Sequence, residues 1–432
     1  MTHPASRRTI LHDVNSDRPG PYLCRTVEID DPGALELLPS GRPEWTAWLR
    51  RGDGLVGLGT LARLDQAVGA ESWWQALCSR MDVVDEVGLP GTGPVAFGSF
   101  VFDPAHTADH SRLVVPRAVV GRRNGRAWLT RIAPAGEPVE PADALLRVAG
   151  SGPTSVDAPT VTSVTPASLE RADWQAAVAE ALGRFDDTFT KVVLARAVDA
   201  QASGPIEART LVASLAGRYP TCWTYHVDGL VGASPELLIR RDQGLATSRV
   251  LAGTIRRHGD DEVDRALAQA LARSSKNLTE HELAVASVAA ALAPFCSGMN
   301  VPEAPSVLEL PNVFHLATDI TGVAHGEASA LSLATALHPS AAVCGTPADV
   351  ARATIAELEH LDRGRYAGPV GWMDAAGDGE FAIALRCGQV DPNDARHILL
   401  YAGCGIVAES DPADEYAETL AKLVPMLEAL GL

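Results

Sequence analysis

Hydrophobic and polar residues follow different spacings before and after about residue 165. In the first part, short apolar runs broken by Gly and Pro predict a helix over residues 71–81 and strands over residues 93–102 and 111–123. The stretch 149–168 is poor in large apolar residues and rich in Ser, Thr and Pro, which predicts a connecting loop. We therefore expect the boundary between the two parts of the chain to lie in this stretch.

Longer amphipathic helices and β-branched strands follow this boundary. The expected elements are helices over 169–185, 274–295 and 411–430, a strand over 191–201, three strands over 222–257 and a strand pair over 397–410. Because strands occur in runs instead of alternating strictly with helices, the pattern favours an α+β layered body over a doubly wound sheet.

The closing helix carries a polar stripe. Asp411 is expected to cap this helix, with Pro412 at its first position. At about 100° per residue, Glu418 and Lys422 fall within about 60° of Glu415. The opposite arc, expected to face the core, contains Tyr416, Leu420, Leu423, Val424 and Leu427. Spacing alone predicts that the stripe is a solvated face with a Glu–Lys pair four residues apart.

A similar stripe marks the helix over 274–295. Lys276, Asn277 and Glu280 share one face, whereas His281 points toward the apolar arc and is interpreted first as a core histidine with satisfied hydrogen bonds. Carboxylates from the two helices could bind a hard cation, because Mg²⁺ favours one or two carboxylates together with water and substrate oxygens.

Two further residues suit acid–base chemistry. Lys191 opens the strand KVVLARAV, and a desolvated lysine at a strand entrance can act as a general base. Glu236 follows Pro235 in GASPELLIRR, and a buried glutamate can keep its proton and serve as an acid. The ordinary interpretations, an edge lysine in water and an exposed turn glutamate, stay open at this point.

Two glycine-containing stretches suit anion binding. Gly253 in LAGTIRR lets a ligand approach the backbone, and the amide of Thr254 could hold a carboxylate. Tyr366 and Arg386 lie in YAGPVGWMDAAGDGEFAIALRCG, which lacks the spacing of a phosphate-binding loop or a dinucleotide fingerprint.

Composition excludes several classes of function. The 432-residue chain has a formal net charge of −18, which argues against binding to nucleic acids or to anionic membranes. Its 46% hydrophobic and 21% charged residues are ordinary for a globular protein. The sequence has no apolar run of about 18 residues, and its seven cysteines are scattered without a CxxC pair. We therefore expect a reduced cytoplasmic protein without a membrane span.

Taken in order, the motifs of the second part resemble the chorismate-utilising enzyme family. The matching strings are KVVLAR, GASPELL, LAGTIRR, KNLTEH, LPNVFHLATDITG, HPSAAVCGTP, DRGRYAGPVGW, GEFAIALRC, AGCGIVAESDP and EYAETLAKL. The resemblance covers about residues 170–430. It implies one α+β body of two facing β-sheets with helices outside, in which residues 1–165 form an N-terminal part of weaker match and residues 166–432 the chorismate-binding catalytic region.

The resemblance also implies roles for individual residues. Lys191 looks like the base that activates water for attack at C2 of chorismate, and Glu236 looks like the acid that protonates the departing C4 hydroxyl. Glu280 and Glu418 look like ligands of Mg²⁺, with Glu415 close by or acting through water. The remaining residues look like the clamp on the substrate carboxylates and the pocket around the ring: Gly253, Thr254, His315, Ala342, Tyr366, Arg386 and Lys422.

Two positions indicate which activity within the family this chain is expected to have. By resemblance, Lys191 indicates water as the nucleophile, and Ala342 resembles the isochorismate synthases, where salicylate synthases commonly carry Thr. We therefore expect a monomeric isochorismate synthase that feeds siderophore, menaquinone or salicylate-type pathways without an amidotransferase partner. The alternatives are salicylate synthase, the amine-forming anthranilate and aminodeoxychorismate synthases, and a non-catalytic chorismate-binding protein. Asn277 stands where many relatives carry an acid, so no metal role is assigned to it.

Overall fold

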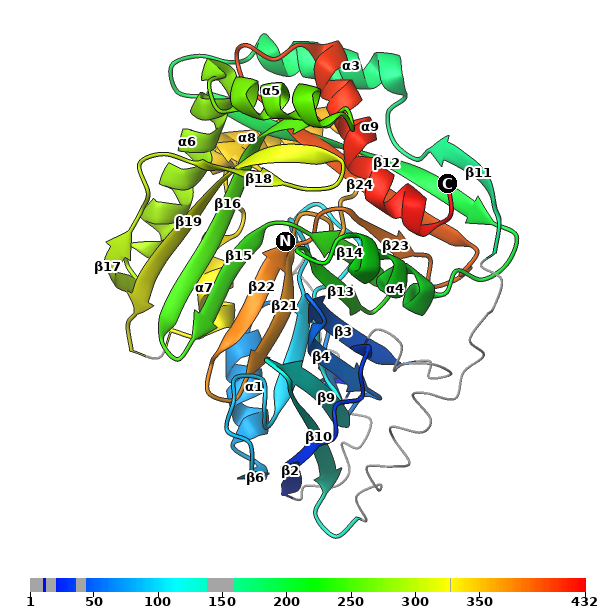
Figure 1. Cartoon of the computed structure of the whole chain (residues 1–432), viewed down its shortest axis with the longest axis vertical. Coiled ribbons are helices and arrows are strands. Elements are labelled where there is room, and N and C mark those ends of the chain that lie inside the picture. The colour runs from blue at the N-terminus through cyan, green and yellow to red at the C-terminus, as the bar shows by residue number, and fades with distance from the viewer. Residues whose placement is uncertain (1–10, 13–20, 36–43, 138–158, 327) are drawn as a thin grey trace, which may run out of the picture.

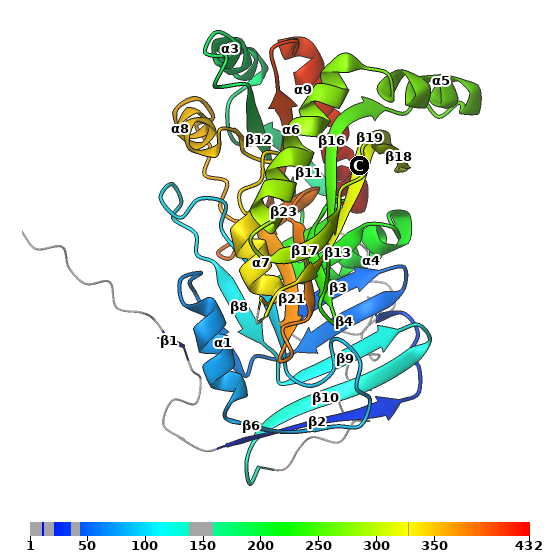
Figure 2. The ribbon, with the colours of Figure 1, turned by 90° about the vertical axis from the view of Figure 1, so that its left-hand side faces the viewer.

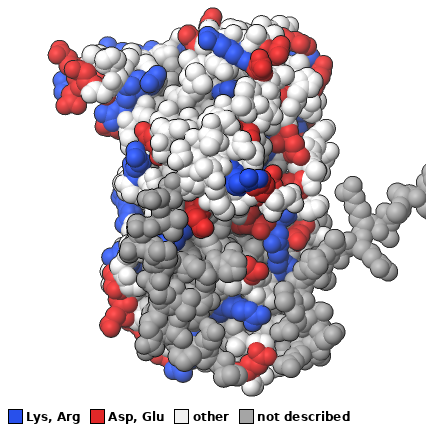
Figure 3. Space-filling view, turned by 90° about the vertical axis from the view of Figure 1, so that its right-hand side faces the viewer, with Lys and Arg blue, Asp and Glu red and all other residues white. Residues whose placement is uncertain are grey.

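Two large β-sheets face each other and carry helices on their outer sides (Figures 1 and 2), as the sequence predicted. The computed structural model describes residues 11–12, 21–35, 44–137, 159–326 and 328–432. Within these ranges, no helix is long and apolar enough to cross a membrane. On the face shown in Figure 3, acidic and basic side chains are interspersed among the described residues.

The first sheet is built mainly from the middle of the chain. Its order is β1 (Leu11–His12), β5 (Ala62–Leu64), β8 (Arg112–Val115), β7 (Val95–Ser99), β21 (Pro369–Asp374), β22 (Gly379–Ile383), β15 (Leu237–Asp242), β16 (Leu245–Arg256), β19 (Val313–Ala324) and β17 (Cys296–Asn300), with β18 (Ser306–Glu309) also paired to β19. Every described pairing in this sheet is antiparallel.

The second sheet includes the strand that begins with Lys191. Its order is β11 (Val161–Pro166), β12 (Lys191–Ala202), β24 (His397–Ile406), β23 (Cys387–Val390), β14 (Leu230–Ser234), β13 (Trp223–Val227), β3 (Trp45–Arg50), β4 (Asp53–Leu58), β9 (Ala118–Arg123), β10 (Arg126–Pro134), β2 (Tyr22–Ile29) and β6 (Met81–Asp85), with β20 (Gly345–Thr346) on β12. Here β2 and β6 run parallel.

Helices cover these sheets where hydrophobic faces would otherwise meet water. The described helices are α1 (Ala70–Cys78), α3 (Arg171–Leu182), α4 (Ala208–Arg218), α5 (Asp261–Leu271), α6 (Ser275–Leu292), α7 (Ala330–Leu337), α8 (Ala348–Leu358) and α9 (Pro412–Ala429). Helices α6 and α7 pack on the first sheet, whereas α4, α8 and α9 pack on the second. The expected cap of the closing helix is confirmed, because the side chain of Asp411 accepts hydrogen bonds from the amides of Ala413 and Asp414.

Strands from both parts of the chain complete both sheets. In the second sheet β3 pairs with β13, and in the first sheet β7 pairs with β21. Large aromatic side chains fill the core between the sheets and under the helices, and those of Phe97, Trp128, Trp223, Tyr225 and Phe381 are fully buried. Burial of one large apolar side chain stabilises a fold by about 1.5–3 kcal/mol, so this shared core ties the two parts together.

Two predicted elements of the first part differ from the structure. The single strand predicted over 111–123 is two strands, β8 and β9, which belong to different sheets. Pro116 lies between them, and a proline cannot donate a ladder hydrogen bond. The predicted loop 149–168 contains β11, whose residues pair with the exposed edge of β12. Residues 149–158 of that predicted loop lie outside the described residues.

Two predicted strand counts also need correction. The segment 222–257 forms four strands, β13 to β16. Turns with positive φ angles at Asp228 and Gly229 and at Gln243 and Gly244 make two of the three breaks, and at Pro235 the chain passes from the second sheet to the first. The segment 397–410 forms one strand, β24, instead of a pair, because its glycines Gly403 and Gly405 continue the ladder with β12.

Candidate active site

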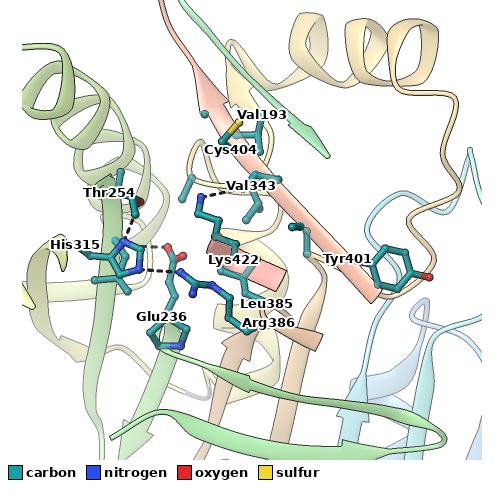
Figure 4. Close-up of a pocket in the computed structure, with 18 of the residues that line it drawn as sticks. Val193, Glu236, Thr254, His315, Val343, Leu385, Arg386, Tyr401, Cys404 and Lys422 are labelled. Carbon is teal, nitrogen blue, oxygen red and sulfur yellow. Dashed lines mark hydrogen bonds between the residues drawn. The ribbon is translucent and has the colours of Figure 1, made fainter. Parts of the chain in front are cut away.

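A cavity opens between the two sheets near the ends of α6 and α9 (Figure 4). It encloses about 660 Å³ up to its mouth, which suits a small-molecule ligand. Strands β16 and β19 of the first sheet and β12 and β24 of the second form its walls. Nine of the twelve predicted site residues line it: Glu236, Gly253, Thr254, Glu280, His315, Ala342, Tyr366, Arg386 and Lys422. Lys191 and Glu418 do not line the cavity but form ion pairs with lining residues, Glu280 and Lys422 respectively, and Glu415 pairs with Lys276.

Glu236 is a buried carboxyl at the entrance of β15. Its side chain reaches the cavity from the first sheet, and its Oε1 accepts a hydrogen bond from the amide of Leu251 at 3.4 Å. Burial raises its pKa to about 8, against the weaker opposing effects of that amide and of Lys191. Glu236 therefore carries a proton at neutral pH and can donate it to a leaving oxygen.

Thr254, His315 and Arg386 form a hydrogen-bonded chain along the cavity (Figure 4). A guanidinium nitrogen of Arg386 lies 2.9 Å from Nε2 of His315, and Nδ1 of His315 lies 3.1 Å from Oγ1 of Thr254. A guanidinium can only donate, so Nε2 accepts and Nδ1 carries the proton. Burial and the charge of Arg386 hold the pKa of His315 well below its usual range, so this histidine is neutral and fixes the direction of the guanidinium.

Lys191 is fully buried at the start of β12, which excludes the edge lysine in water. Its Nζ lies 3.3 Å from Oε1 of Glu280 but makes no well-aligned hydrogen bond within the described part of the chain. Gly405 of the neighbouring strand β24 faces both groups. A side-chain carbon at Gly405 would collide with the carboxylate of Glu280 and would lie 3.1 Å from Cε of Lys191. Glycine is thus required here to bring the lysine and the carboxylate together.

The stripe on α9 faces inward, which corrects the prediction of a solvated face. Glu415 is 2% exposed, whereas Leu420, predicted to face the core, is 48% exposed. The helix packs against β24, α3 and α4 and approaches β16, so the polar stripe is turned toward the protein together with part of the expected apolar arc, because Leu423 is buried. An ion pair with a neighbouring helix offsets the cost of burying this carboxylate, because Nζ of Lys276 in α6 lies 2.5 Å from Oε1 of Glu415.

Each predicted metal-binding carboxylate is paired with a lysine. The pairs are Lys191 with Glu280 at 3.3 Å, Lys276 with Glu415 at 2.5 Å and Lys422 with Glu418 at 2.6 Å. The chain contains only these three lysines among its 36 basic Lys and Arg residues, so every lysine lies at this site. Lysine supplies a compact charge that can also lose its proton, which arginine cannot do.

The three carboxylates converge on the ammonium of Lys276. The charges of Glu415, then Glu418 and Glu280, raise the pKa of Lys276 despite its burial. Burial and the charge of Glu418 raise the pKa of Glu415. No group of three or more His, Cys, Asp or Glu side chains in the described ranges already has the spacing to hold an ion. The donor set nevertheless fits Mg²⁺, because it consists of crowded carboxylate oxygens that an added cation would stabilise.

Two other predicted site residues, Tyr366 and Gly253, make packing contacts that the sequence did not predict. Tyr366 stacks on Tyr401 with ring centroids 5.0 Å apart, which fixes the wall beside Arg386. Gly253 has a φ of 78° at a bulge in β16, and a side chain there would meet Asn277 of α6 at 2.9 Å. Glycine at this position therefore also allows the close approach of α6, while the backbone of Gly253 lines the cavity.

The histidine on α6 has the structural role that was expected. His281 is buried, and its Nε2 lies 2.8 Å from Oγ1 of Thr318 while its Nδ1 lies 3.3 Å from the carbonyl oxygen of Ala252. Sequence reasoning missed Lys276 as the partner of Glu415. The signal was its shared face with Glu280, but the pairing depends on how α6 and α9 pack across 139 positions of sequence.

The fold and this cavity define a chorismate-binding enzyme. The family described as chorismate binding enzyme matches residues 29–431, and the chain belongs to it. The match begins well before residue 165 and so includes most of the N-terminal part.

Several similar proteins are named as isochorismate synthases. A Mycobacterium tuberculosis protein provisionally named isochorismate synthase MenF is 40% identical over 354 residues, which cover 79% of this chain and 88% of that protein. The salicylate biosynthesis isochorismate synthase of Pseudomonas aeruginosa is 36% identical over 383 residues, covering 84% of this chain and 78% of its own. The solved structure of MenF, the menaquinone-specific isochorismate synthase from Escherichia coli, superposes with a TM-score of 0.78 at 27% identity, covering 96% of each chain.

Proposed function

We propose that the protein is an isochorismate synthase, which converts chorismate to isochorismate with the help of Mg²⁺. The observation that carries this proposal is the placement of two buried proton-transfer groups on facing sheets. Lys191 begins a strand of the second sheet, and Glu236 enters the first sheet with a pKa raised to about 8. The names of the relatives support the same activity.

The reaction needs a base and an acid on opposite sides of the substrate ring. Lys191, when neutral, takes a proton from water that attacks C2, and protonated Glu236 gives its proton to the C4 oxygen as that bond breaks. One hydroxyl is added and one leaves, so the product is an isomer of the substrate. Each proton transfer contributes about 10²–10⁴ in rate.

The substrate is a dicarboxylate, and cationic side chains offset its charge. The fixed guanidinium of Arg386 and the ammonium of Lys422 reach the cavity from the second sheet and from α9. Glu280 and Glu418 would hold Mg²⁺, with Glu415 close by or bound through water, and the ion would supply positive charge at the substrate carboxylate. Tyr366 and the backbone of Thr254 complete the clamp.

The product is proposed to be isochorismate and not salicylate. Ala342 lines the cavity with only a methyl group, which constrains the enolpyruvyl group of the substrate little and disfavours elimination of pyruvate. The alternative, salicylate synthase, keeps all other roles. The names of the relatives place their product in menaquinone or salicylate formation, and we propose one of these destinations here.

A product assay tests the proposal. Purified protein is incubated with chorismate and Mg²⁺, and the products are separated by chromatography. Isochorismate alone is expected. Accumulation of salicylate and pyruvate would establish the alternative, and product formed only with added ammonia would establish an amine-forming synthase. Unchanged chorismate would overturn the enzymatic proposal.

A further inference from the structure

One edge of strand β12, just beyond Lys191, is completed by side chains instead of a neighbouring strand. Among the described pairings on this side, β20 pairs only with Lys191 and Val192, and β11 pairs only from Val198 onward. Residues 193–197 between them are buried. Their backbone groups on this side need other partners, because an unpaired N–H or C=O group away from water costs free energy.

The ion pair of Glu359 and Arg363 supplies partners for this edge. Nη2 of Arg363 donates to the carbonyl oxygen of Val193 at 2.8 Å, and Oε2 of Glu359 accepts a hydrogen bond from the amide of Ala195 at 2.8 Å. The two side chains bind each other through both carboxylate oxygens, at 2.7 and 2.6 Å. Paired hydrogen bonds of this kind fix the relative orientation of the two groups. The ion pair therefore takes the place of a neighbouring strand at this point of β12.

The same guanidinium holds the loop that carries Ala342. Nη1 of Arg363 donates to the carbonyl oxygen of Val343 at 2.9 Å, and the amide of Val193 donates to the carbonyl oxygen of Cys344 at 2.8 Å. Val193, Ala342 and Val343 all line the active-site cavity, and the first and last of these are labelled in Figure 4. One side chain thus joins the strand of the proposed base to the loop that contains Ala342.

The cavity wall at Tyr366 depends on the same residue. The amide of Tyr366 donates to the carbonyl oxygen of Arg363 at 2.9 Å, and the guanidinium carbon lies 6.0 Å from the centre of the tyrosine ring. That carbon also lies 4.3 Å from the ring centre of Phe102. A displacement of Arg363 would therefore affect three parts of the cavity wall together: strand β12, the loop of Ala342 and Tyr366.

Arg363 lines the cavity, but its guanidinium is already engaged by protein groups. Its hydrogen bonds to Glu359, Val193 and Val343 use four of the five N–H donors of a guanidinium. Both members of the ion pair are buried, with 4% of Arg363 and 2% of Glu359 exposed. Although burial opposes it, the charge and hydrogen bonds of Glu359 raise the pKa of Arg363, so the pair stays ionised. The pair therefore adds no net charge with which to attract a dicarboxylate substrate.

We propose that Glu359 and Arg363 are positioning residues, which hold the strand of Lys191 and the loop of Ala342 in one fixed arrangement for the reaction. The effect on rate rests on the proposed function, whereas the coupling of strand and loop does not. A lysine at position 363 keeps the charge but lacks the planar fork that reaches the carboxylate and two carbonyl groups at once. Loss of the arrangement should slow the chemical step more than it weakens substrate binding, because reacting groups tolerate little misplacement.

Steady-state kinetics of two variants test the effect on the reaction, with consumption of chorismate as the readout so that the identity of the product does not matter. The variants are Arg363→Lys and the double variant Glu359→Leu, Arg363→Met, which leaves no unpaired charge buried. We expect kcat to fall by about 10–100-fold in both, with KM changed by less than about threefold.

Arg184→Lys is the matched control, because Arg184 also pairs with a glutamate four positions earlier, but at the surface. It should behave like the unaltered protein. A rise in KM at unchanged kcat would make Arg363 a substrate-binding residue, and unchanged kinetics in both variants would leave the pair a purely structural role. Either result would overturn the proposal.

Amide hydrogen exchange separates this proposal from the proposed function. Peptides covering residues 191–197 and 340–346 should exchange at least about tenfold faster in both variants than in the unaltered protein, while peptides from β15 and β16 should not change. Absence of chorismate turnover in the unaltered protein would refute the proposed function and leave this measurement valid. Unchanged exchange in both segments would overturn the positioning role whatever the activity.

Discussion

The two residues proposed to transfer protons in the active site are buried. Lys191 and Glu236, the proposed base and acid, are both buried and have few partners. Lys191 contacts Glu280 without a well-aligned hydrogen bond, and Glu236 accepts one backbone hydrogen bond. These few contacts are compatible with the proton transfers proposed for the two residues.

Replacement of Lys191 separates its charge from its ability to take a proton. We expect Lys191→Ala and Lys191→Arg both to lower kcat by about 10²–10⁴, because an arginine stays protonated. Lys191→Arg keeps a cation beside Glu280 and should retain more of the stability of the fold. Steady-state kinetics and thermal unfolding measure the two effects. Full turnover in either variant would contradict the assignment of Lys191 as the base.

Glu236 should make the stability of the protein depend on pH. Its pKa is raised from 4.5 to about 8, so the folded protein keeps a proton that the unfolded chain loses between these values. Stability contributed by this proton is complete below pH 4.5 and is lost as pH rises toward 8. In Glu236→Gln this loss should be absent, which favours the variant by a few kcal/mol at pH 8.5 relative to pH 5. Denaturant unfolding at both values measures it, with the exposed Glu303→Gln as control. A parallel pH response of Glu236→Gln and unaltered protein would refute the buried acid.

At the scale of elements, the site depends on contacts between segments that are distant in sequence. Helix α6 brings Glu280 to Lys191 of β12 and brings Lys276 to Glu415 of α9. Strand β24 allows Glu280 to come close to Lys191 only because residue 405 is glycine.

Gly405→Ala tests that close approach. The added methyl group would push aside the carboxylate of Glu280 and press on Lys191, while the flexible end of Glu280 can move and spare the fold. We expect kcat to fall by about 10–100-fold, since a small misplacement of reacting groups is costly, with little change in thermal stability. Gly217→Ala, where a new methyl group meets no atom within 4 Å, is the control. Full activity in Gly405→Ala would show that the lysine–glutamate contact is not needed.

Lys276 occupies the place where a cation is expected to act. In Lys276→Met, Glu415 and its neighbours lose their internal cation, so the three carboxylates should attract an added one more strongly. We expect Mg²⁺ to bind about tenfold more tightly, a gain of about 1.4 kcal/mol, while the protein without Mg²⁺ becomes less stable. Calorimetric titration with Mg²⁺ measures this, with the exposed Arg265→Met as control. Weaker or unchanged Mg²⁺ binding would mean that Lys276 does not compete for these carboxylates.

The sequence predicted the elements better than their contacts. Periodicity located α6 and α9 within a few residues, because capping residues and helical spacing are local signals. Periodicity also predicted that the polar stripe of α9 faces solvent. The spacing of residues within one helix does not show which of its faces other elements will cover. Family resemblance named twelve site residues, and nine of them line one cavity. The lysine–carboxylate pairs could not be predicted, because each joins segments far apart in the chain.

At the scale of the whole molecule, the charges of the active site nearly cancel before any ligand binds. Three lysines pair with three carboxylates, Glu236 is protonated, His315 is neutral, and the guanidinium of Arg386 leaves one positive charge. A dicarboxylate substrate alone adds two negative charges, and Mg²⁺ alone adds two positive ones. Together they leave the balance unchanged.

This balance predicts that Mg²⁺ and chorismate strengthen each other's binding. Titration of Mg²⁺ into the inactive Lys191→Arg variant, with and without chorismate, avoids turnover during the measurement. We expect chorismate to tighten Mg²⁺ binding by at least about tenfold, and Mg²⁺ to tighten chorismate binding by the same factor, because binding couplings are reciprocal. Independent binding of the two ligands would show that charge balance does not govern the site.

The confinement of all three lysines to one site gives the protein a natural chemical label. Amine-reactive reagents meet ε-amino groups only at Lys191, Lys276 and Lys422, since every other basic side chain is arginine or histidine. Because Lys191 is fully buried, mass spectrometry of a lightly acylated sample would report site occupancy through the fractions of Lys276 and Lys422 that a ligand protects. No tag, probe or engineered residue would be needed to follow occupancy in a mixture.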